Sequence, residues 1–120
     1  MNRNQFVWLF FGLSGRLSRL PYLLAGLLLF LVLFFPAYQI IRALEEERAT
    51  DFWVLLSWIS TLLFLWCHVA LGVKRLHDFG KPGTYALLIP LFVGLAFIIL
   101  CIYKGDEGAN AYGRQTNAPK

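Results

Sequence analysis

The chain has 120 residues, of which 58% are hydrophobic and only 15% carry a charged side chain. A small soluble domain of this composition would leave a large apolar surface in water, so the composition excludes an ordinary soluble domain and favours a membrane protein. The formal net charge is +4, but the cations lie at the borders of apolar runs and no nucleic-acid-binding motif is present, so we expect anionic lipid and not nucleic acid as the charged partner.

The first nineteen residues are predicted to form an arm that lies in the membrane interface. The arm contains Arg3, Arg16 and Arg19, no acidic residue, and four aromatic side chains just before the first long apolar run: Phe6, Trp8, Phe10 and Phe11. Aromatic rings favour the headgroup level, where arginines face lipid phosphates. The apolar stretch 6–11 is too short for a cleavable signal peptide, so we expect the arm to be retained. The alternative is an unstructured tail.

Three charge-free runs of 22 residues each follow, at 20–41, 52–73 and 82–103. About 20 apolar residues are enough to cross a hydrocarbon core of roughly 30 Å. The connectors, 42–51 and 74–81, are short, which makes consecutive helices antiparallel neighbours. The sequence therefore predicts an all-α membrane protein with three transmembrane helices. It forms a single domain over residues 1–120, with the interfacial arm before the helices and a polar tail of turns, 104–120, after them.

The third run leaves two arrangements open, because Pro90 and Gly94 lie in its centre. A re-entrant hairpin broken there would return the tail to the side of the second connector. We expect a continuous crossing, because unpaired peptide groups deep in hydrocarbon each cost several kcal/mol and two other helices offer little cover. The arm and second connector are then expected on the cytoplasmic side, with six Lys and Arg residues against five on the other side.

The second run carries a stripe of small and polar residues at helical spacing, Ser57, Ser60, Thr61, His68 and Gly72. Small and hydroxyl-bearing residues allow close helix packing, so this stripe is expected to face protein and the opposite face lipid. For His68 we expect a neutral ring bonded to a neighbouring helix, with proton exchange as the alternative. Cys67 and Cys101 lack metal-ligand spacing and are expected to be buried free thiols.

The second connector and its borders form the main polar segment inside the apolar part of the chain. Residues 73–83 read Val-Lys-Arg-Leu-His-Asp-Phe-Gly-Lys-Pro-Gly and contain five of the twenty Asp, Glu, Lys, Arg and His residues. A partner that needs an anion site or a proton donor would meet it here. Lys74 and Arg75 also stand where a helix C-terminus carries partial negative charge, so they stabilise that helix end in any case.

Three polar segments together resemble the bacterial domain of unknown function 805 family. They are Gly15-Arg16-Leu17-Ser18-Arg19 with Tyr22; Lys74-Arg75-Leu76-His77-Asp78 with Gly80 and Gly83; and Gly105, Gly108, Asn110, Tyr112 and Gly113. Ile89-Pro90 and Gly94 also match, whereas Leu20, Pro21 and Thr84 depart from the usual pattern. The resemblance covers residues 11–113. It implies a small, multi-pass protein of the bacterial inner (plasma) membrane, and a shared site of Arg16, Arg19, Lys74, Arg75, His77, Asp78, Asn110 and Tyr112. The family has no established activity.

Three functions are compatible with these residues, and none requires a cofactor or a metal. The first, which we favour, is a non-enzymatic binding or interaction module that recognises anionic lipid headgroups or a partner membrane protein. Arg16 and Arg19 are three residues apart, on one side of a helical turn, and guanidinium groups suit phosphate geometry.

The second function is a membrane enzyme on lipid-linked phosphate, with His77 as acid or base and Arg75 or Arg16 holding the phosphate. Adjacent residues on a helix point about 100° apart, so Asp78 would not orient His77 within a helix. The third is one subunit of a homo-oligomeric transporter, because three helices are too few to enclose a path. Asp106 and Glu107 lack the spacing of a calcium loop, so we expect no metal site.

Overall fold

The fold was obtained as a computed structural model that describes residues 1–119 and measures 56 × 30 × 21 Å along its principal axes. Lys120, the last residue of the predicted tail, lies outside the described residues. The elements are α1 (Arg3–Phe11), α2 (Arg19–Glu45), α3 (Asp51–Asp78), the 3₁₀ helix η1 (Gly83–Leu91) and α4 (Val93–Ile102). No β-strand occurs in residues 1–119, so the predicted all-α class is confirmed.

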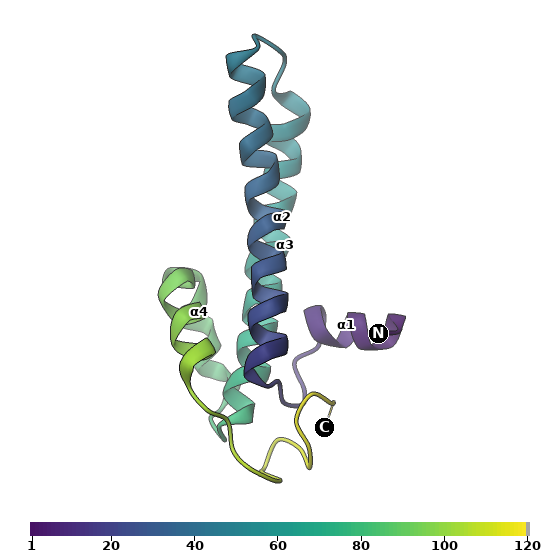
Figure 1. Ribbon diagram of the computed structural model, residues 1–120, viewed down its shortest axis with the longest axis vertical. Helices are drawn as coiled ribbons and strands as arrows, with labels where there is room; N and C mark the ends of the chain where they lie inside the picture. Colours follow the sequence, from purple (N-terminus) through teal and green to yellow (C-terminus); the bar gives the residue numbers. More distant parts are fainter. Residues whose placement is uncertain (120) are drawn as a thin grey trace.

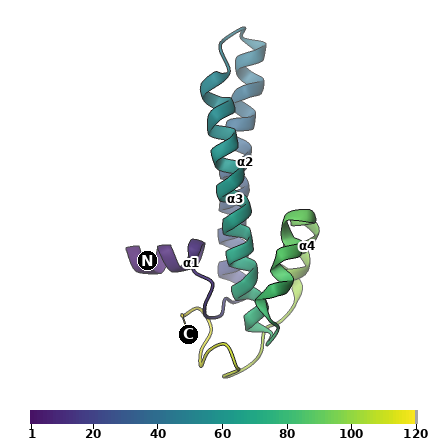
Figure 2. The same ribbon diagram turned by 180° about the vertical axis from the view of Figure 1, so that it is seen from behind.

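A long antiparallel hairpin of α2 and α3 forms the axis of the molecule (Figure 1). Helix α1 lies crosswise to this hairpin near its lower end, in the position expected for an interfacial arm. Helix α4 runs beside the lower half of the hairpin on the opposite side, and the view from behind agrees (Figure 2). The tail passes beneath the hairpin, from the end of α4 toward the α1 side.

Helices α2 and α3 are long and apolar enough to cross a membrane. Their 27 and 28 residues extend about 40 Å at 1.5 Å per residue, more than the roughly 30 Å of a hydrocarbon core. Only 28% and 33% of their most apolar windows are buried, whereas a core helix of a soluble protein would be mostly buried. The predicted spans 20–41 and 52–73 both fall inside these two helices.

The predicted stripe on the second long helix, α3, faces protein. Ser60, His68 and Gly72 are buried against neighbouring elements, while Leu55 and Leu62 on the opposite face are exposed. Cys67 and Cys101 are free thiols, and Cys67 is buried whereas Cys101 is half-buried. The helical periodicity of small and polar residues therefore identified the packed face correctly.

The third apolar run is not one continuous helix but is divided into η1 and α4, so the prediction of a third transmembrane helix over 82–103 is not confirmed. Helix η1 enters beside α3 and α4 returns beside α2, and the tail emerges at the same end as the arm (Figures 1 and 2). Nine residues of 3₁₀ helix extend about 18 Å and ten residues of α-helix about 15 Å. Each arm of this hairpin is therefore about half as long as a hydrocarbon core is thick, and the chain turns back between the two.

Two peptide groups at the turn are hydrogen-bonded, which lowers part of the cost that argued against a re-entrant hairpin. Pro90 has no N–H and cannot donate to a continuous helix. The N–H of Phe92 donates to the Ile89 carbonyl at 3.1 Å, and the N–H of Ala96 donates to the Phe92 carbonyl at 2.8 Å. The chain thus reverses between η1 and α4 with these peptide groups bonded internally.

Two glycines let the hairpin α2–α3 cover the re-entrant elements. A Cβ on Gly72 would lie 2.1 Å from the Ile89 Cδ1, and a Cβ on Gly26 would lie 2.1 Å from the Phe97 Cε2. These glycines form notches, one on α3 that receives η1 and one on α2 that receives α4. The two long helices therefore pack closely against η1 and α4 and bury part of their surface, although the sequence alone predicts little cover from two helices.

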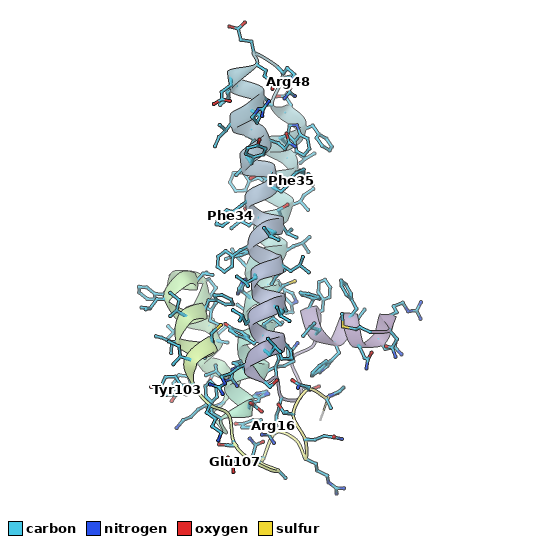
Figure 3. The ribbon with its side chains drawn as sticks, in the orientation of Figure 1. Arg16, Phe34, Phe35, Arg48, Tyr103 and Glu107 are labelled. Carbon is cyan, nitrogen blue, oxygen red and sulfur yellow. The ribbon has the colours of Figure 1, made fainter. Side chains whose placement is uncertain are left out.

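The return of the tail concentrates positive charge at one end of the molecule, which we call the basic end. Of the ten Lys and Arg residues within 1–119, eight lie there: Arg3, Arg16, Arg19, Lys74, Arg75, Lys81, Lys104 and Arg114. Figure 3 shows Arg16 and Glu107 at this end and Arg48 at the opposite end. Because cytoplasmic loops carry the excess of Lys and Arg, we expect the basic end to be cytoplasmic.

Among the described residues, the opposite end of the hairpin has two cations, Arg42 and Arg48. Both bind the exposed Glu46, with Arg42 Nη2 at 2.6 Å and Arg48 Nε at 2.7 Å from its carboxylate oxygens. The hydrogen bond from Arg42, followed by that from Arg48, lowers the pKa of Glu46. These cations are thus partly neutralised locally, which strengthens the charge difference between the two ends.

Candidate functional site

The carboxylate of Asp78, the last residue of α3, joins the three polar segments. Its Oδ1 accepts hydrogen bonds from Arg16 Nε at 3.0 Å and from Thr116 Oγ1 at 2.7 Å. Its Oδ2 accepts from Arg75 Nη1 at 2.9 Å. Asp78 is 4% exposed. One buried carboxylate therefore connects the arm, the end of α3 and the tail.

Arg16 is buried in the loop before α2, and carbonyl groups of the tail surround its guanidinium. Nη1 donates to the carbonyls of Gly108 at 2.5 Å and Gly113 at 3.3 Å, and Nη2 donates to that of Asp106 at 2.8 Å. A guanidinium has five N–H donors in a fixed plane. Together with the bond to Asp78, these contacts use most of the hydrogen-bond donors of the guanidinium. Arg16 therefore links the tail to the arm.

Arg75 is fully buried and caps the C-terminus of α4. Its Nε donates to the Leu100 carbonyl at 2.8 Å, its Nη2 donates to the Tyr103 carbonyl, and its Nη1 also donates to the Leu17 carbonyl at 3.2 Å. The last carbonyls of a helix have no partner within the helix and carry partial negative charge. A cation bonded to the Leu100 carbonyl in the last turn and to the carbonyl of the cap residue Tyr103 therefore stabilises the C-terminal end of α4.

Lys74 caps the C-terminus of α1 in the same way. Its Nζ donates to the carbonyls of Trp8 and Leu9, both at 2.6 Å, and to that of Gly12 at 2.7 Å, so its three N–H groups are all used. Neighbouring side chains on a helix point about 100° apart. Lys74 and Arg75 therefore hold two different helices, α1 and α4, on opposite sides of the hairpin.

His77 belongs to a second layer of this network. Its ring stacks on that of Tyr112 with centroids 4.1 Å apart and planes 3° from parallel, and its Nδ1 lies 3.0 Å from the Gly15 carbonyl oxygen. Asn110 Nδ2 donates to the His77 carbonyl at 2.9 Å, and Asn110 Oδ1 accepts from the Tyr112 N–H at 2.9 Å. The tail thus contacts His77 twice: Asn110 bonds its backbone carbonyl and Tyr112 stacks on its ring.

The structure brings six of the eight predicted site residues into one network: Arg16, Arg75, His77, Asp78, Asn110 and Tyr112. Lys74 lies next to them in sequence but turns toward α1. Arg19 is exposed at the edge, and its Nη1 makes one long bond, 3.4 Å, to the Ile102 carbonyl. The assembly of the three segments is what the re-entrant alternative predicted.

Sequence reasoning missed the neutral residues that complete the network. Thr116 bonds Asp78, and Asn117 Oδ1 accepts from the Ser18 N–H at 2.8 Å. A Cβ on Gly105 would lie 1.8 Å from Asp78 Oδ2, so only glycine fits there without displacing the carboxylate. Thr116 and Asn117 give no signal in composition, whereas Gly105 was already part of the family pattern.

The sequence that forms this network matches a known protein family. The family described as "Protein of unknown function (DUF805)" matches residues 10–114, a range that contains all eight site residues predicted from the sequence. The chain belongs to this family. It is 30% identical over 112 residues to the Inner membrane protein YhaI of Escherichia coli K12 and to that of Escherichia coli O157:H7. These alignments cover 91% of this chain and 86% of each relative. No solved structure matches the chain.

Membership of the DUF805 family confirms the resemblance drawn from the three polar segments. It also confirms the expected localisation, a multi-pass protein of the bacterial inner membrane, because the relatives are inner-membrane proteins and α2 and α3 are long enough to span. The two long apolar helices thus agree with the membrane location of the relatives.

Proposed function

We propose that this protein is a non-enzymatic membrane module that binds anionic lipid headgroups with its basic end. The observation that carries the proposal is a set of five exposed cations at this end, called the ring for brevity: Arg3, Arg19, Lys81, Lys104 and Arg114. Two exposed acids, Asp106 and Glu107, reduce the excess to three positive charges. Each basic residue near an anionic leaflet contributes about 1 kcal/mol, so the ring supports roughly a 100-fold preference for anionic over neutral lipid.

The buried cations have a different role in this proposal. Arg16 and Arg75 are 1% and 0% exposed and are bonded to Asp78 and to backbone carbonyls. A phosphate could reach them only by displacing the tail or the end of α4. Lipid recognition is therefore assigned to the exposed ring, of which Arg19 alone was among the predicted site residues.

The same bonding weakens the case for an enzyme on lipid-linked phosphate. That function needs Arg75 or Arg16 to hold a phosphate and His77 to move a proton. The N–H groups of both arginines already donate to acceptors within the protein, which leaves few of them for a phosphate. The Asp78 carboxylate accepts hydrogen bonds from these arginines and from Thr116. A binding module uses the network as a scaffold and needs no group from it to react.

Helix α1 supports contact between the basic end and lipid headgroups. Phe6, Val7 and Phe11 are exposed on it, and Arg3 lies in its first turn. A helix lying crosswise to the hairpin with exposed aromatic rings suits the headgroup level, where rings and arginines are both favourable. The interfacial arm predicted from the sequence is thus part of the proposed lipid surface.

Neutralising three of the exposed cations is expected to remove the preference for anionic lipid. In the variant Arg19→Gln, Lys81→Gln, Lys104→Gln, the remaining Arg3 and Arg114 are balanced by the two exposed acids. The roughly 100-fold preference for phosphatidylglycerol over phosphatidylcholine should fall to about one, by the estimate of about 1 kcal/mol per residue. Native mass spectrometry of protein in mixed-lipid nanodiscs measures this preference as the ratio of retained lipids.

The matched control is Arg42→Gln, Arg48→Gln at the opposite end, which should leave the preference unchanged. Raising the salt concentration should weaken binding to the wild type, because exposed charges are screened. Equal retention of both lipids by the wild-type protein would contradict the proposal. A copurifying protein lost with the triple variant would instead identify a partner protein as the ligand of the ring.

A further inference from the structure

An apolar groove of about 330 Å³ runs along the re-entrant hairpin between η1 and α4. Tyr85, Leu88 and Phe92 line it on one side, and Leu95, Ala96 and Ile99 line it on the other. Leu88 and Leu95 are more than half exposed, so the groove opens sideways toward the bilayer. Apart from the Tyr85 hydroxyl, these lining side chains offer only hydrocarbon surface.

The length of the groove matches one leaflet of the bilayer. From Tyr85 to Leu91 the 3₁₀ helix rises about 12 Å at roughly 2.0 Å per residue, and Phe92 follows at the turn. Half of a hydrocarbon core of roughly 30 Å is about 15 Å. A groove that begins at the basic end and stops where the chain turns back therefore has the depth of the acyl chains in that leaflet.

Two lysines lie in sequence close to the ends of the two elements that form the groove. Lys81 lies two residues before η1 and Lys104 two residues after α4, and both are exposed. The connector and the tail meet here, because a Cβ on Gly80 would lie 2.9 Å from Asp106 Oδ2. This carboxylate, which accepts a hydrogen bond from Asn110 Nδ2 at 3.0 Å, offsets one of the two positive charges. Lys104 Nζ binds Glu107 at 2.7 Å, but both side chains are well exposed. Such exposed ion pairs are weak and exchange readily for another anion.

We propose that this groove holds one acyl chain of an anionic phospholipid whose phosphate lies between Lys81 and Lys104. The inference rests on the proposed function and gives it a specific site. The size of the groove favours an acyl chain over a helix of a second copy. A helix about 10 Å wide and about 12 Å long fills roughly 940 Å³, nearly three times the volume available.

Filling the groove tests this site without altering its charges. Ala96→Phe places a ring in the groove from α4, and Leu88→Trp fills it from the exposed edge of η1. The control is Leu91→Trp, because Leu91 is 71% exposed and does not line the groove. Native mass spectrometry with rising collisional activation follows phosphatidylglycerol, and glycerol phosphate serves as a probe with the headgroup chemistry but no acyl chain.

The wild type and Leu91→Trp are expected to retain one phosphatidylglycerol at activation that removes all others. Both groove variants should lose this last lipid at least tenfold more readily while keeping the overall preference for anionic lipid. Glycerol phosphate should not be retained. Size-exclusion chromatography and circular dichroism check folding, and if Ala96→Phe misfolds, Leu88→Trp at the exposed edge decides the result.

Retention of the last lipid by folded groove variants as strongly as by the wild type overturns the groove while leaving the proposed function intact. Retention of glycerol phosphate in place of the lipid also overturns it, because no acyl chain is then needed. A dimer that dissociates in Leu88→Trp would place a second copy in the groove and overturn it as well. If the wild-type protein shows no preference for anionic over neutral lipid, that separate result contradicts the proposed function.

Discussion

Replacement of Asp78 by Ala is expected to destabilise the fold by about 3–5 kcal/mol, the usual cost of removing one partner from a buried ion pair. The variant leaves Arg16 and Arg75, which are 1% and 0% exposed, without the carboxylate that lies between them. Two buried cations then face each other in a poorly hydrated site. The Thr116 hydroxyl also loses its acceptor, so the tail is released together with the arm.

Thermal or denaturant unfolding in detergent micelles measures this effect. Glu107→Gln is the matched control, because it removes a carboxylate from an exposed pair with Lys104 in the same tail. Exposed pairs contribute about 0–1 kcal/mol, so the control should remain close to the wild type. If Asp78→Ala and Glu107→Gln change the free energy of unfolding by similar amounts, Asp78 does not organise the three segments.

The conservative change Arg75→Lys is expected to release α4 and the tail even though it preserves the charge. The planar guanidinium bonds the carbonyls of Leu17, Leu100 and Tyr103 as well as Asp78, in four directions. A lysine has a single ammonium group with three donors and cannot reach all of these acceptors. Loss of two bonds to a charged group, each about 1.5–3 kcal/mol, predicts a local destabilisation of about 3 kcal/mol or more.

Hydrogen exchange of the backbone amides localises the effect of Arg75→Lys. Protection in α4 and the tail should fall by roughly 100-fold, the factor equivalent to about 3 kcal/mol, while amides in the upper half of the α2–α3 hairpin keep theirs. Arg48→Lys at the opposite end should leave α4 unchanged. If the exchange protection of the α4 amides in Arg75→Lys stays within threefold of the wild type, a positive charge without the planar guanidinium is sufficient to hold α4.

The two long helices could be predicted from sequence because length and composition decide them. Residues 20–41 and 52–73 are charge-free, long enough to cross, and bordered by charged residues. The third run has the same length and lacks charge as well, so composition could not separate crossing from return. That choice depends on contacts between elements, such as Phe97 in the notch at Gly26, and on the caps supplied by Arg75.

The candidate site was predicted as a set of residues more accurately than as a surface. The motif brought Arg16, Arg75 and Asp78 together, but charge alone suggested that they face an external anion. They turn inward because the carbonyls at the end of α4 and along the tail supply the acceptors. Backbone groups are the same at every position, so a sequence pattern contains no sign of which carbonyls will surround a cation.

In the structure the third apolar run turns back and brings the tail to the side of the arm. Single cysteines at Asn4, Ala49 and Gln115, all exposed positions, test this arrangement in a background with Cys67→Ala and Cys101→Ala. Intact spheroplasts are treated with a membrane-impermeant maleimide, before and after lysis. We expect labelling of Ala49→Cys in intact spheroplasts, and of Asn4→Cys and Gln115→Cys only after lysis. Labelling of Gln115→Cys in intact spheroplasts while Asn4→Cys stays protected would contradict this arrangement.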